Sequence, residues 1–338
     1  MNFVVFAGGV GGAKLSHGMA RSVGAELLTV IVNTADDLEM HGLHVSPDLD
    51  TVMYTLGGIA NPETGWGIVG DTFGNFEMLQ TLGMNPWCRL GDRDLAVHMT
   101  RTQLIKDGRT LSEAVAFLSG RLGIRSRILP MTNDRVRTIV DTDEGLFSFQ
   151  EYFVKARWQP QVRSLIYEGA EEAEALPAAV RAIETADTII IAPSNLYLSI
   201  DPILSMGDVK DALLNASAPI IAVTPIISGE AVKGPAAKLM RELGEDPSAS
   251  AVAEHYSDFI NGFVLDERDA HLKSQIEDMG VGVLVTDTLM KDDDDRARLA
   301  CEVVTFADQL RPEKLGGCKL DQSALDAGSE TGTLLNGG

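Results

Sequence analysis

Six short apolar runs punctuate the chain, and each is rich in β-branched residues. They are continuous rather than alternating, which is typical of strands buried on both faces of a parallel sheet. Amphipathic helical patterns separate most of them, and strands that alternate with helices indicate an α/β fold. The pattern therefore predicts a doubly wound, mainly parallel six-stranded sheet. The runs are Asn2–Ala7, Leu27–Asn33, Thr188–Ala192, Pro219–Thr224, Gly262–Leu265 and Gly282–Thr286.

The gap between the second and third runs is too long for a single crossover connection. Four helical patterns fill its first part, and two β-like runs, 136–141 and 146–154, flank the turn 142–145 as in a hairpin. We therefore predict a core of residues 1–47 and 166–312, and a mostly helical insertion at 48–165 that carries a β-hairpin. Residues 313–338 are rich in Gly, Ser, Thr and acidic residues, and are predicted to be disordered. The helical patterns are Asp48–Leu56, Thr72–Leu82, Arg93–Lys106 and Ser112–Gly120.

Composition narrows the class of protein. The 338 residues carry a net charge of −21, which argues against nucleic acid and membrane partners, because those bind basic faces. No apolar run approaches the ~20 residues of a membrane span, and no signal peptide is visible. The three cysteines lack metal-binding spacing, which indicates reduced thiols and a cytoplasmic protein. An acidic chain that binds an anion often needs a metal ion between the two, so clustered carboxylates become important.

Polar and glycine residues follow the apolar runs at the same end of the predicted sheet. In an open parallel sheet the ligand lies beyond the carboxyl ends of the strands, so these clusters predict a binding site there. The clusters are Gly8–Gly12, Asn33–Asp37, Pro193–Asn195, Pro225–Gly229 and Asp287–Thr288.

The first cluster, Gly8-Gly-Val-Gly-Gly12, stands between a predicted strand and a predicted helix. Such a loop can hold a phosphate on backbone N–H groups at a helix N-terminus, which makes Gly9, Gly11 and Gly12 candidates for a phosphate-binding or nucleotide-binding site. The alternative is that the loop is only a tight turn. The loop matches neither common fingerprint. A dinucleotide site needs a third glycine where Lys14 stands, and a Walker loop needs Ser or Thr after the lysine. Lys14 itself either pairs with a phosphate or is a solvated first-turn lysine.

Two pairs of aspartates follow the second run. Asp36 and Asp37 could hold a ribose hydroxyl, contribute to a magnesium site, or cap the next helix. Asp48 and Asp50 precede an apolar helix, where they could face one cation or act as helix caps. Mg²⁺ prefers hard oxygen ligands and needs only one or two carboxylates beside a substrate phosphate.

Further candidates lie in two later stretches. Gly91-Asp-Arg-Asp94 opens a helix, where Asp92 is a possible cap and Arg93 a possible phosphate clamp, and His98 follows one turn later. The alternatives are a surface charge cluster and a packed histidine. Ser194 and Asn195 suit a turn at a strand end, where they bind a nucleotide or satisfy their own backbone. Tryptophans 66, 87 and 158 could stack on an aromatic ring, although core packing is their commoner use.

Taken together, these stretches resemble the 2-phospho-L-lactate transferases of coenzyme F-420 biosynthesis, the family called CofD in archaea and FbiA in actinobacteria. The matching segments run in family order over residues 1–310, and the ordered set is specific although no single segment is. They are GGVGGAK (8–14), NTADD (33–37), MHG (40–42), SPDLDT (46–51), GDRDLA (91–96), FQEYFV (149–154), APSN (192–195), SIDPIL (199–204), TPIISG (224–229) and KGPA (233–236).

The resemblance implies a Rossmann-like core and a homodimer. It implies transfer of a phosphate-linked three-carbon acid from a guanosine-diphosphate-linked donor to the deazaflavin FO. The terminal ribityl hydroxyl of FO attacks the distal phosphorus and GMP leaves, in a Mg²⁺-dependent reaction of EC 2.7.8 type. The donor acid, which could be 2-phospholactate, phosphoenolpyruvate or 3-phosphoglycerate, is not readable from the sequence.

The resemblance also implies roles for the candidate residues. Asp36 and Asp50 are expected to be catalytic and to hold the metal, with Asp37 and Asp48 as adjacent candidates. The donor is expected on the glycine loop, and the acceptor under the insertion. The expected donor-binding residues are Gly9, Gly11, Gly12, Lys14, Ser194 and Asn195, and the expected acceptor-binding residues are Asp92, Arg93 and His98.

Three positions depart from the common family pattern. Ala35 stands where glycine is usual, Leu196 where proline is usual, and Asp201 where glycine is usual. The second and third place the details of the guanosine loop in doubt. Two other functions stay open: an NAD-dependent oxidoreductase, which the missing third glycine disfavours, and a non-catalytic nucleotide-binding regulatory relative.

Overall fold

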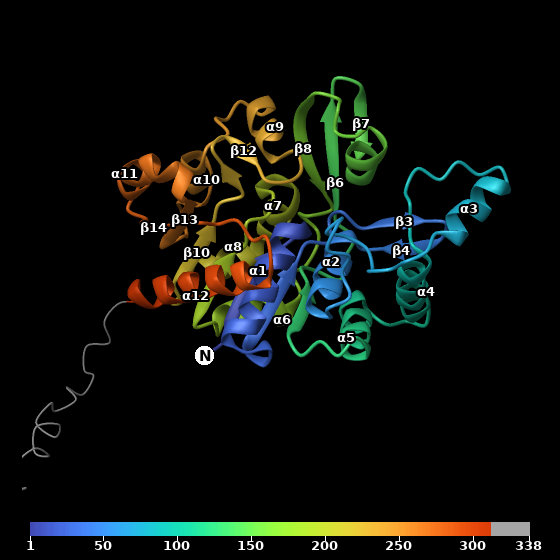
Figure 1. The fold of residues 1–338 in the computed structure, drawn as a ribbon, viewed down its shortest axis with the longest axis horizontal. Coiled ribbons are helices and arrows are strands. Elements are labelled where there is room, and N and C mark those ends of the chain that lie inside the picture. The colour runs from blue at the N-terminus through green and yellow to red at the C-terminus, as the bar shows by residue number, and fades with distance from the viewer. Residues whose placement is uncertain (312–338) are drawn as a thin grey trace, which may run out of the picture.

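The computed structural model describes residues 1–311, and the expected disordered segment 313–338 lies outside them. A seven-stranded sheet runs through the centre (Figure 1), and all of its strand pairs are parallel. The strands are, in spatial order, β14 (Gly282–Thr286), β13 (Gly262–Asp266), β10 (Ile220–Val223), β9 (Thr188–Ile191), β1 (Phe3–Ala7), β2 (Leu28–Val32) and β5 (Arg127–Pro130).

The six predicted strands are all present, and β5 adds a seventh at one edge. Sequence reasoning missed β5 because only Ile128 and Leu129 are apolar between an arginine and a proline. A proline is tolerated there because β5 pairs only with β2 and its other edge is free of ladder bonds. Since β5 falls inside the range 48–165, that segment contributes a strand to the core as well as covering it.

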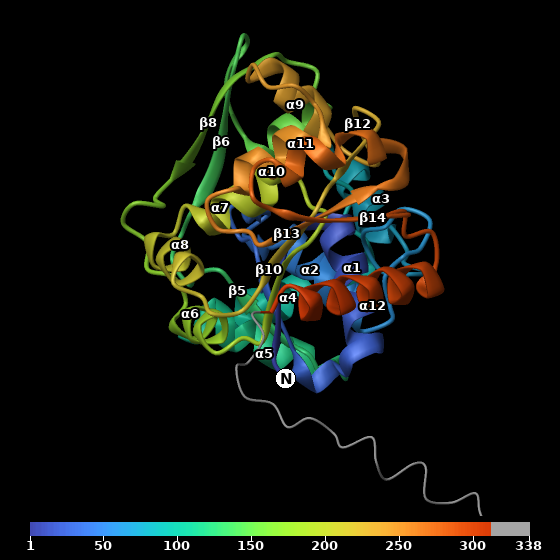
Figure 2. The same ribbon diagram turned by 90° about the vertical axis from the view of Figure 1, so that its left-hand side faces the viewer.

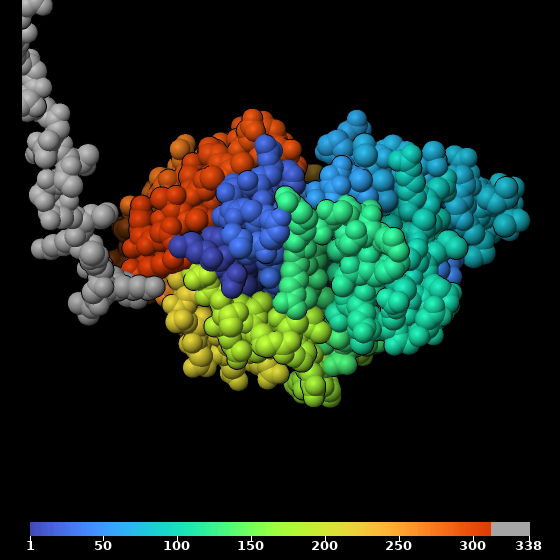
Figure 3. All heavy atoms as spheres, turned by 90° about the horizontal axis from the view of Figure 1, so that it is seen from below, coloured from blue at the N-terminus to red at the C-terminus, as the bar shows by residue number. Residues whose placement is uncertain are grey.

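Helices pack on both faces of the sheet, because alternate residues of each strand point in opposite directions. Val4 and Phe6 of β1 join one core cluster, whereas Phe3 and Val5 join the other. The second cluster lies under α1, α2, α5 and α12, and Figure 3 shows α12, in red, against the blue N-terminal segment. These helices are α1 (Gly9–Val23), α2 (Pro47–Leu56), α5 (Leu111–Arg121) and α12 (Asp293–Gln309).

The opposite face is covered by shorter helices and turns, several of which Figure 2 shows above and beside the sheet. They are α6 (Pro177–Glu184), α7 (Asp201–Leu204), α8 (Gly207–Leu214), α9 (Ala236–Glu242), α10 (Ala249–Tyr256) and α11 (Lys273–Glu277), with turns at Leu196–Ile200 and Glu267–Leu272. A short turn at Ala25–Leu27 joins α1 to β2 and has no buried residue.

The predicted hairpin is confirmed, with β6 (Arg137–Thr142) antiparallel to β7 (Gly145–Ser148). Its second strand is shorter than predicted, because Glu151–Lys155 form a helical turn. Phe149 and Phe153 are four residues apart, which is a helical spacing, and their rings stack with centroids 5.4 Å apart. A further strand, β8 (Val162–Glu168), pairs with β6 and completes a three-stranded sheet.

The four helices predicted for the long segment are also present, namely α2, α3 (Gly74–Thr81), α4 (Asp92–Lys106) and α5. The chain between α2 and α4, residues 57–91, forms an arm that carries α3 away from the core (Figure 1), and α3 has no buried residue. Two small hairpins complete the fold: β3 (Leu38–Met40) with β4 (Leu43–Val45), and β11 (Ile226–Ile227) with β12 (Glu230–Ala231). Within the described residues, no helix is long and apolar enough to cross a membrane.

Candidate functional site

A cavity of about 1150 Å³ opens at the carboxyl ends of the strands. All five polar clusters that the sequence placed there contribute to its wall, which confirms that they gather at the same end of the sheet. The arm and the segment that follows β7 supply the other side, with aromatic residues that include Trp66, Phe73 and Trp87. The cavity therefore has one wall built by the sheet and one built by the intervening segments.

The glycine loop lies where the strand order reverses, between β1 and β9. Loops diverge at such a point and leave a crevice for a ligand. Gly11 packs directly on the β9 loop, because a Cβ atom at this position would lie 2.2 Å from the carbonyl oxygen of Pro193. At Gly12 a Cβ atom would lie 2.7 Å from Oγ of Ser194, and this glycine does not line the cavity. The glycines thus let two strand-end loops meet, which is a packing role besides any ligand contact.

Two N–H groups of the loop are already bonded within the protein. The Gly8 N–H donates to Oγ of Ser194 at 3.2 Å, and the Gly9 N–H donates to Oδ1 of Asp48 at 2.7 Å. The N–H groups of Val10 and Gly11 follow in the first turn of α1, where a helix supplies no acceptor of its own. The turn also contains no acidic residue. The N–H groups of Val10 and Gly11 are therefore the ones chemically suited to an anion.

Lys14, Ser194 and Asn195 all line the cavity, as expected for donor-binding residues. The Lys14 ammonium donates to the carbonyl of Met290 at 2.7 Å, which fixes it beside the loop after β14. Oδ1 of Asn195 accepts from the N–H groups of Tyr197 and Leu198, both at 3.1 Å, and so caps the turn that follows. The turn forms although Leu196 replaces the usual proline.

Asp36 and Asp48 form a pair of buried carboxylates at the cavity wall. Asp48 accepts hydrogen bonds from Gly9 and from the Asn33 amide, the latter at 3.0 Å, whereas Oδ1 of Asp36 is buried without a hydrogen-bond partner. Burial raises the pKa of both carboxyls, and the charge of Asp48 adds to the effect on the pKa of Asp36. Two neighbouring buried carboxylates, one of which has an oxygen without a hydrogen-bond partner, are chemically suited to a bound cation.

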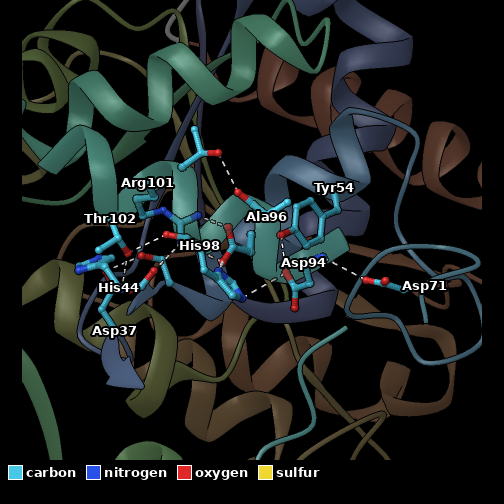
Figure 4. A network of polar contacts seen from close by, with 12 residues as sticks. Asp37, His44, Tyr54, Asp71, Asp94, Ala96, His98, Arg101 and Thr102 are labelled. Atoms are coloured by element: carbon cyan, nitrogen blue, oxygen red, sulfur yellow. Dashed lines mark hydrogen bonds and ion pairs between the residues drawn. The ribbon is translucent and has the colours of Figure 1, made fainter. Parts of the chain in front are cut away.

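Asp50, two residues further along α2, faces a different neighbour. Both of its carboxylate oxygens accept from the guanidinium of Arg101, which is fully buried. His98 lies between two acids, with Nδ1 3.5 Å from Oδ2 of Asp50 and Nε2 3.3 Å from Oδ1 of Asp94 (Figure 4). Tyr54 donates its hydroxyl hydrogen to the same oxygen of Asp94. Asp50, Asp94 and His98 also offer ligand atoms within 4.8 Å of one another, but Arg101 already neutralises Asp50.

Asp37 does not line the cavity. Its Oδ2 faces Nε2 of His44 at 2.9 Å and accepts from the Ser46 hydroxyl at 2.7 Å. His44 is held in turn by α4, because its N–H donates to Oγ1 of Thr102 and its carbonyl accepts from Arg101 (Figure 4). Asp37 therefore holds the side chain of His44, whose backbone joins the β3–β4 hairpin to α4, rather than facing a ligand.

Asp92 and Arg93 lie outside the cavity wall, unlike His98. The Asp92 carboxylate accepts from the N–H groups of Gly74 and Asn75 and so caps α3. Asp71 does the same for α4, accepting from the N–H groups of Arg93 and Asp94. The Arg93 guanidinium donates to the carbonyl of Val69. The expectation that Asp92 and Arg93 touch the acceptor is not supported by this placement, because both are engaged in holding the arm.

Sequence reasoning missed Arg101 and the roles of Asp94 and Tyr54. One signal was present, because Asp94, His98 and Arg101 are spaced i, i+4 and i+7 on α4 and share one helical face. Polar residues on the buried face of a helix point to a side-chain network.

The sequence profile of the family described as 2-phospho-L-lactate transferase CofD matches residues 3–305. The chain belongs to the CofD family of 2-phospho-L-lactate transferases. It is 44% identical over 314 residues to a 2-phospho-L-lactate transferase of Methanopyrus kandleri, covering 92% of this chain and 99% of that one. It is 40% identical over 317 residues to a phosphoenolpyruvate transferase of Streptomyces coelicolor, with 92% and 99% covered.

The fold has a counterpart among solved structures. A Bacillus halodurans protein of the UPF0052 family superposes with a TM-score of 0.61 at 15% identity, over 90% of this chain and 98% of that one. At such low identity, this similarity speaks for the fold alone. CofD membership and the doubly wound α/β fold are thus established, as the ordered motifs of the sequence indicated.

Proposed function

We propose that this CofD-family protein transfers a phospho-three-carbon-acid group from a guanosine-diphosphate-linked donor to the terminal hydroxyl of the deazaflavin FO, releasing GMP. The reaction belongs to coenzyme F-420 biosynthesis. The observation that carries the proposal is that the glycine loop and the Asp36–Asp48 pair open on the same cavity. The 1150 Å³ cavity exceeds the size of most small-ligand pockets, which suits two substrates.

The sheet side of the cavity suits the donor. Its diphosphate fits against the N–H groups of Val10 and Gly11, with Lys14 beside them. Ser194 and Asn195 face the cavity from the neighbouring strand end, on the side proposed for guanosine.

Asp36 and Asp48 are the residues that would hold Mg²⁺. The unsatisfied oxygen of Asp36 and the absence of a basic partner for either acid within residues 1–311 support this choice. Asp50 is not retained as a ligand, because Arg101 engages it. Asp37 is not retained because it does not line the cavity and His44 and Ser46 engage its Oδ2, although its Oδ1 is also buried without a partner. Bound Mg²⁺ would neutralise charge on the diphosphate.

Asp94 is the group we assign to receive the hydroxyl proton. It lines the cavity, and although burial acts to raise its pKa, the contact with His98 leaves the pKa lower than usual, so it is ionised at neutral pH. As the FO hydroxyl oxygen bonds to the distal phosphorus, its proton passes to the carboxylate. The bond between that phosphorus and the GMP oxygen breaks, and GMP leaves with the electron pair. Asp50, locked by Arg101, fixes His98 behind Asp94.

One experiment tests the proposal. The protein is incubated with FO, Mg²⁺ and each guanylated donor in turn, carrying 2-phospholactate, phosphoenolpyruvate or 3-phosphoglycerate, and the product mass is read. A product with one donor supports the transferase and names its acid. FO binding without product would indicate a regulatory relative, and NADH binding without FO binding would indicate an oxidoreductase. We further propose a cytoplasmic homodimer, on the family resemblance, which light scattering after size-exclusion chromatography tests.

A further inference from the structure

The first loop of the arm, residues 61–67, lies at its inner end, directly over the glycine loop; we call this loop the arm tip. Gly65 shows the closeness: a Cβ atom there would lie 3.0 Å from Cγ1 of Val10 and 3.1 Å from Nζ of Lys233. Gly65 also has φ +80, a conformation that disfavours any other residue. A hydrogen bond joins the two ends of the arm tip, because the Asn61 N–H donates to the Gly67 carbonyl at 3.0 Å. Lys233 therefore lies where the arm tip, the glycine loop and the sheet edge meet.

Lys233 reaches this point from the opposite wall of the cavity, on the loop between β12 and α9. Its ammonium lies 3.4 Å from the carbonyl oxygen of Thr64, a long contact that uses at most one of its three N–H groups. Lys233 and Thr64 both line the cavity. The lysine thus links the two walls above the N-terminus of α1 and keeps donors available for another partner.

A second lysine faces the same space. Burial lowers the pKa of Lys14, and the positive charges of Arg296 and Lys233 lower it further. Lys14 lines the cavity, as Lys233 does. Among residues 1–311, neither lysine forms an ion pair with a carboxylate. In a chain of net charge −21, two neighbouring ammonium groups that form no ion pair with a carboxylate favour the binding of an external anion.

We propose that Lys233 is a donor-binding residue, which together with Lys14 holds an anionic group of the donor, a phosphate or a carboxylate, beneath the arm tip. The same ammonium contacts the Thr64 carbonyl of the arm tip, so one side chain would both bind the donor and hold the arm tip over it. This inference rests on the proposed function for the identity of the ligand, but the anion site itself is independent of turnover.

Calorimetric titration with inorganic pyrophosphate and with GDP tests the site directly. Lys233→Ala is compared with Lys233→Arg, which keeps the charge, and with Lys106→Ala, which removes an exposed lysine on α4 outside the cavity. Loss of one charge-assisted contact at a partly solvated site corresponds to about a tenfold rise in Kd. We expect that rise for Lys233→Ala, a much smaller one for Lys233→Arg, and none for Lys106→Ala. The Kd of wild type should also rise more steeply with salt than that of Lys233→Ala.

Gly65→Ala is a second variant that leaves both charges in place. The new methyl group would push the arm tip away from Val10 and Lys233, so we expect weaker pyrophosphate and GDP binding here too. The arm contact would be wrong if Gly65→Ala bound both ligands as wild type does. Circular dichroism and the melting temperature check that each variant is folded.

The outcomes separate the two proposals. Weaker binding of pyrophosphate and GDP to Lys233→Ala supports a phosphate as the bound group, whereas a higher KM for the complete donor alone supports its carboxylate. Equal affinities and equal KM values for Lys233→Ala and Lys106→Ala would overturn the inference. Weaker pyrophosphate binding in Lys233→Ala, in a protein that does not modify FO, would leave the anion site standing and remove the transferase proposal.

Discussion

Arg101 and Asp50 form a buried ion pair that joins α4 to α2 at the edge of the cavity. Both carboxylate oxygens accept from the guanidinium, and Arg101 also donates to the carbonyl of His44 at 3.3 Å. One side chain thereby positions the helix that carries Asp48, the helix that carries Asp94 and the hairpin that follows Asp37. We regard this pair as the structural centre of the site.

Replacing Arg101 alone should be severely destabilising. In Arg101→Met the Asp50 carboxylate is left buried without a partner, and breaking a buried pair in this way costs about 3–5 kcal/mol. Urea unfolding measures the loss. The double variant Arg101→Met, Asp50→Leu should recover most of it, and Arg163→Met, at an exposed position of β8, should change little. Equal stability of Arg101→Met and Arg163→Met would contradict the pairing.

The Asp36–Asp48 pair predicts a pH dependence of stability in metal-free protein. Burial, and for Asp36 the charge of Asp48, raises the pKa of each folded carboxyl above its unfolded value of 3.8. Ionisation therefore opposes folding, so this contribution is favourable at low pH and is lost as pH rises through the folded pKa, which is about 6 for Asp48. The melting temperature in EDTA should fall less between pH 5 and 8, roughly the window set by these shifts, in Asp36→Asn than in wild type.

Binding of Mg²⁺ to the same two carboxylates should raise the stability that their ionisation lowers. A ligand that binds only the folded state raises its stability by about 2.7 kcal/mol at one hundred times the Kd. At pH 8 we expect Mg²⁺ to raise the melting temperature of wild type, and to have a much reduced effect on Asp36→Asn and Asp48→Asn. Asp37→Asn serves as the comparison, because Asp37 is engaged outside the cavity. An Asp37→Asn variant that loses the Mg²⁺ response while Asp36→Asn keeps it would reverse the assignment.

Gly11 should tolerate no side chain. A methyl group would meet the Pro193 carbonyl at 2.2 Å, and crowding of this kind costs about 1–3 kcal/mol. Gly11→Ala should therefore lower the denaturant midpoint and weaken GDP binding. Gly120→Ala is the matched control, because the site within α5 has no atom within 4 Å, and alanine there should stabilise by about 0.5–1 kcal/mol.

Asp92 should be needed for the order of the arm. Asp92→Ala removes the acceptor for the Gly74 and Asn75 N–H groups, so hydrogen exchange and proteolysis across residues 71–82 should become faster. Arg93→Ala leaves that cap in place and should have a small effect. If both variants raised the KM for FO equally and left exchange unchanged, direct acceptor contact would be the better account.

The fold and the location of the site were predictable, because both depend on local patterns. Buried parallel strands are continuous apolar runs, and their carboxyl ends are marked by polar clusters such as 8–12 and 33–37. Strand β5 escaped prediction because two buried residues, Ile128 and Leu129, are too few to form a pattern. The order in which the motifs appear was sufficient to indicate the CofD family.

The partners of the carboxylates were not predictable. Asp48 and Asp50 are two residues apart, so α2 turns their side chains in different directions, toward the glycine loop and toward α4. Asp50 is neutralised by Arg101, which is 51 positions away in the sequence. No local pattern states which of two acids a distant cation will neutralise.

Asp71 and Asp92 bring a last consequence. Asp71 precedes α3 and binds the N-terminus of α4, whereas Asp92 begins α4 and binds the N-terminus of α3. The starts of the two helices are therefore held together. Asp94 belongs to the first turn of α4, and a swing of the arm would carry it along. Residues 76–90 lie outside these contacts, so substitutions among them should leave the position of Asp94 unchanged as long as Asp71 and Asp92 are kept.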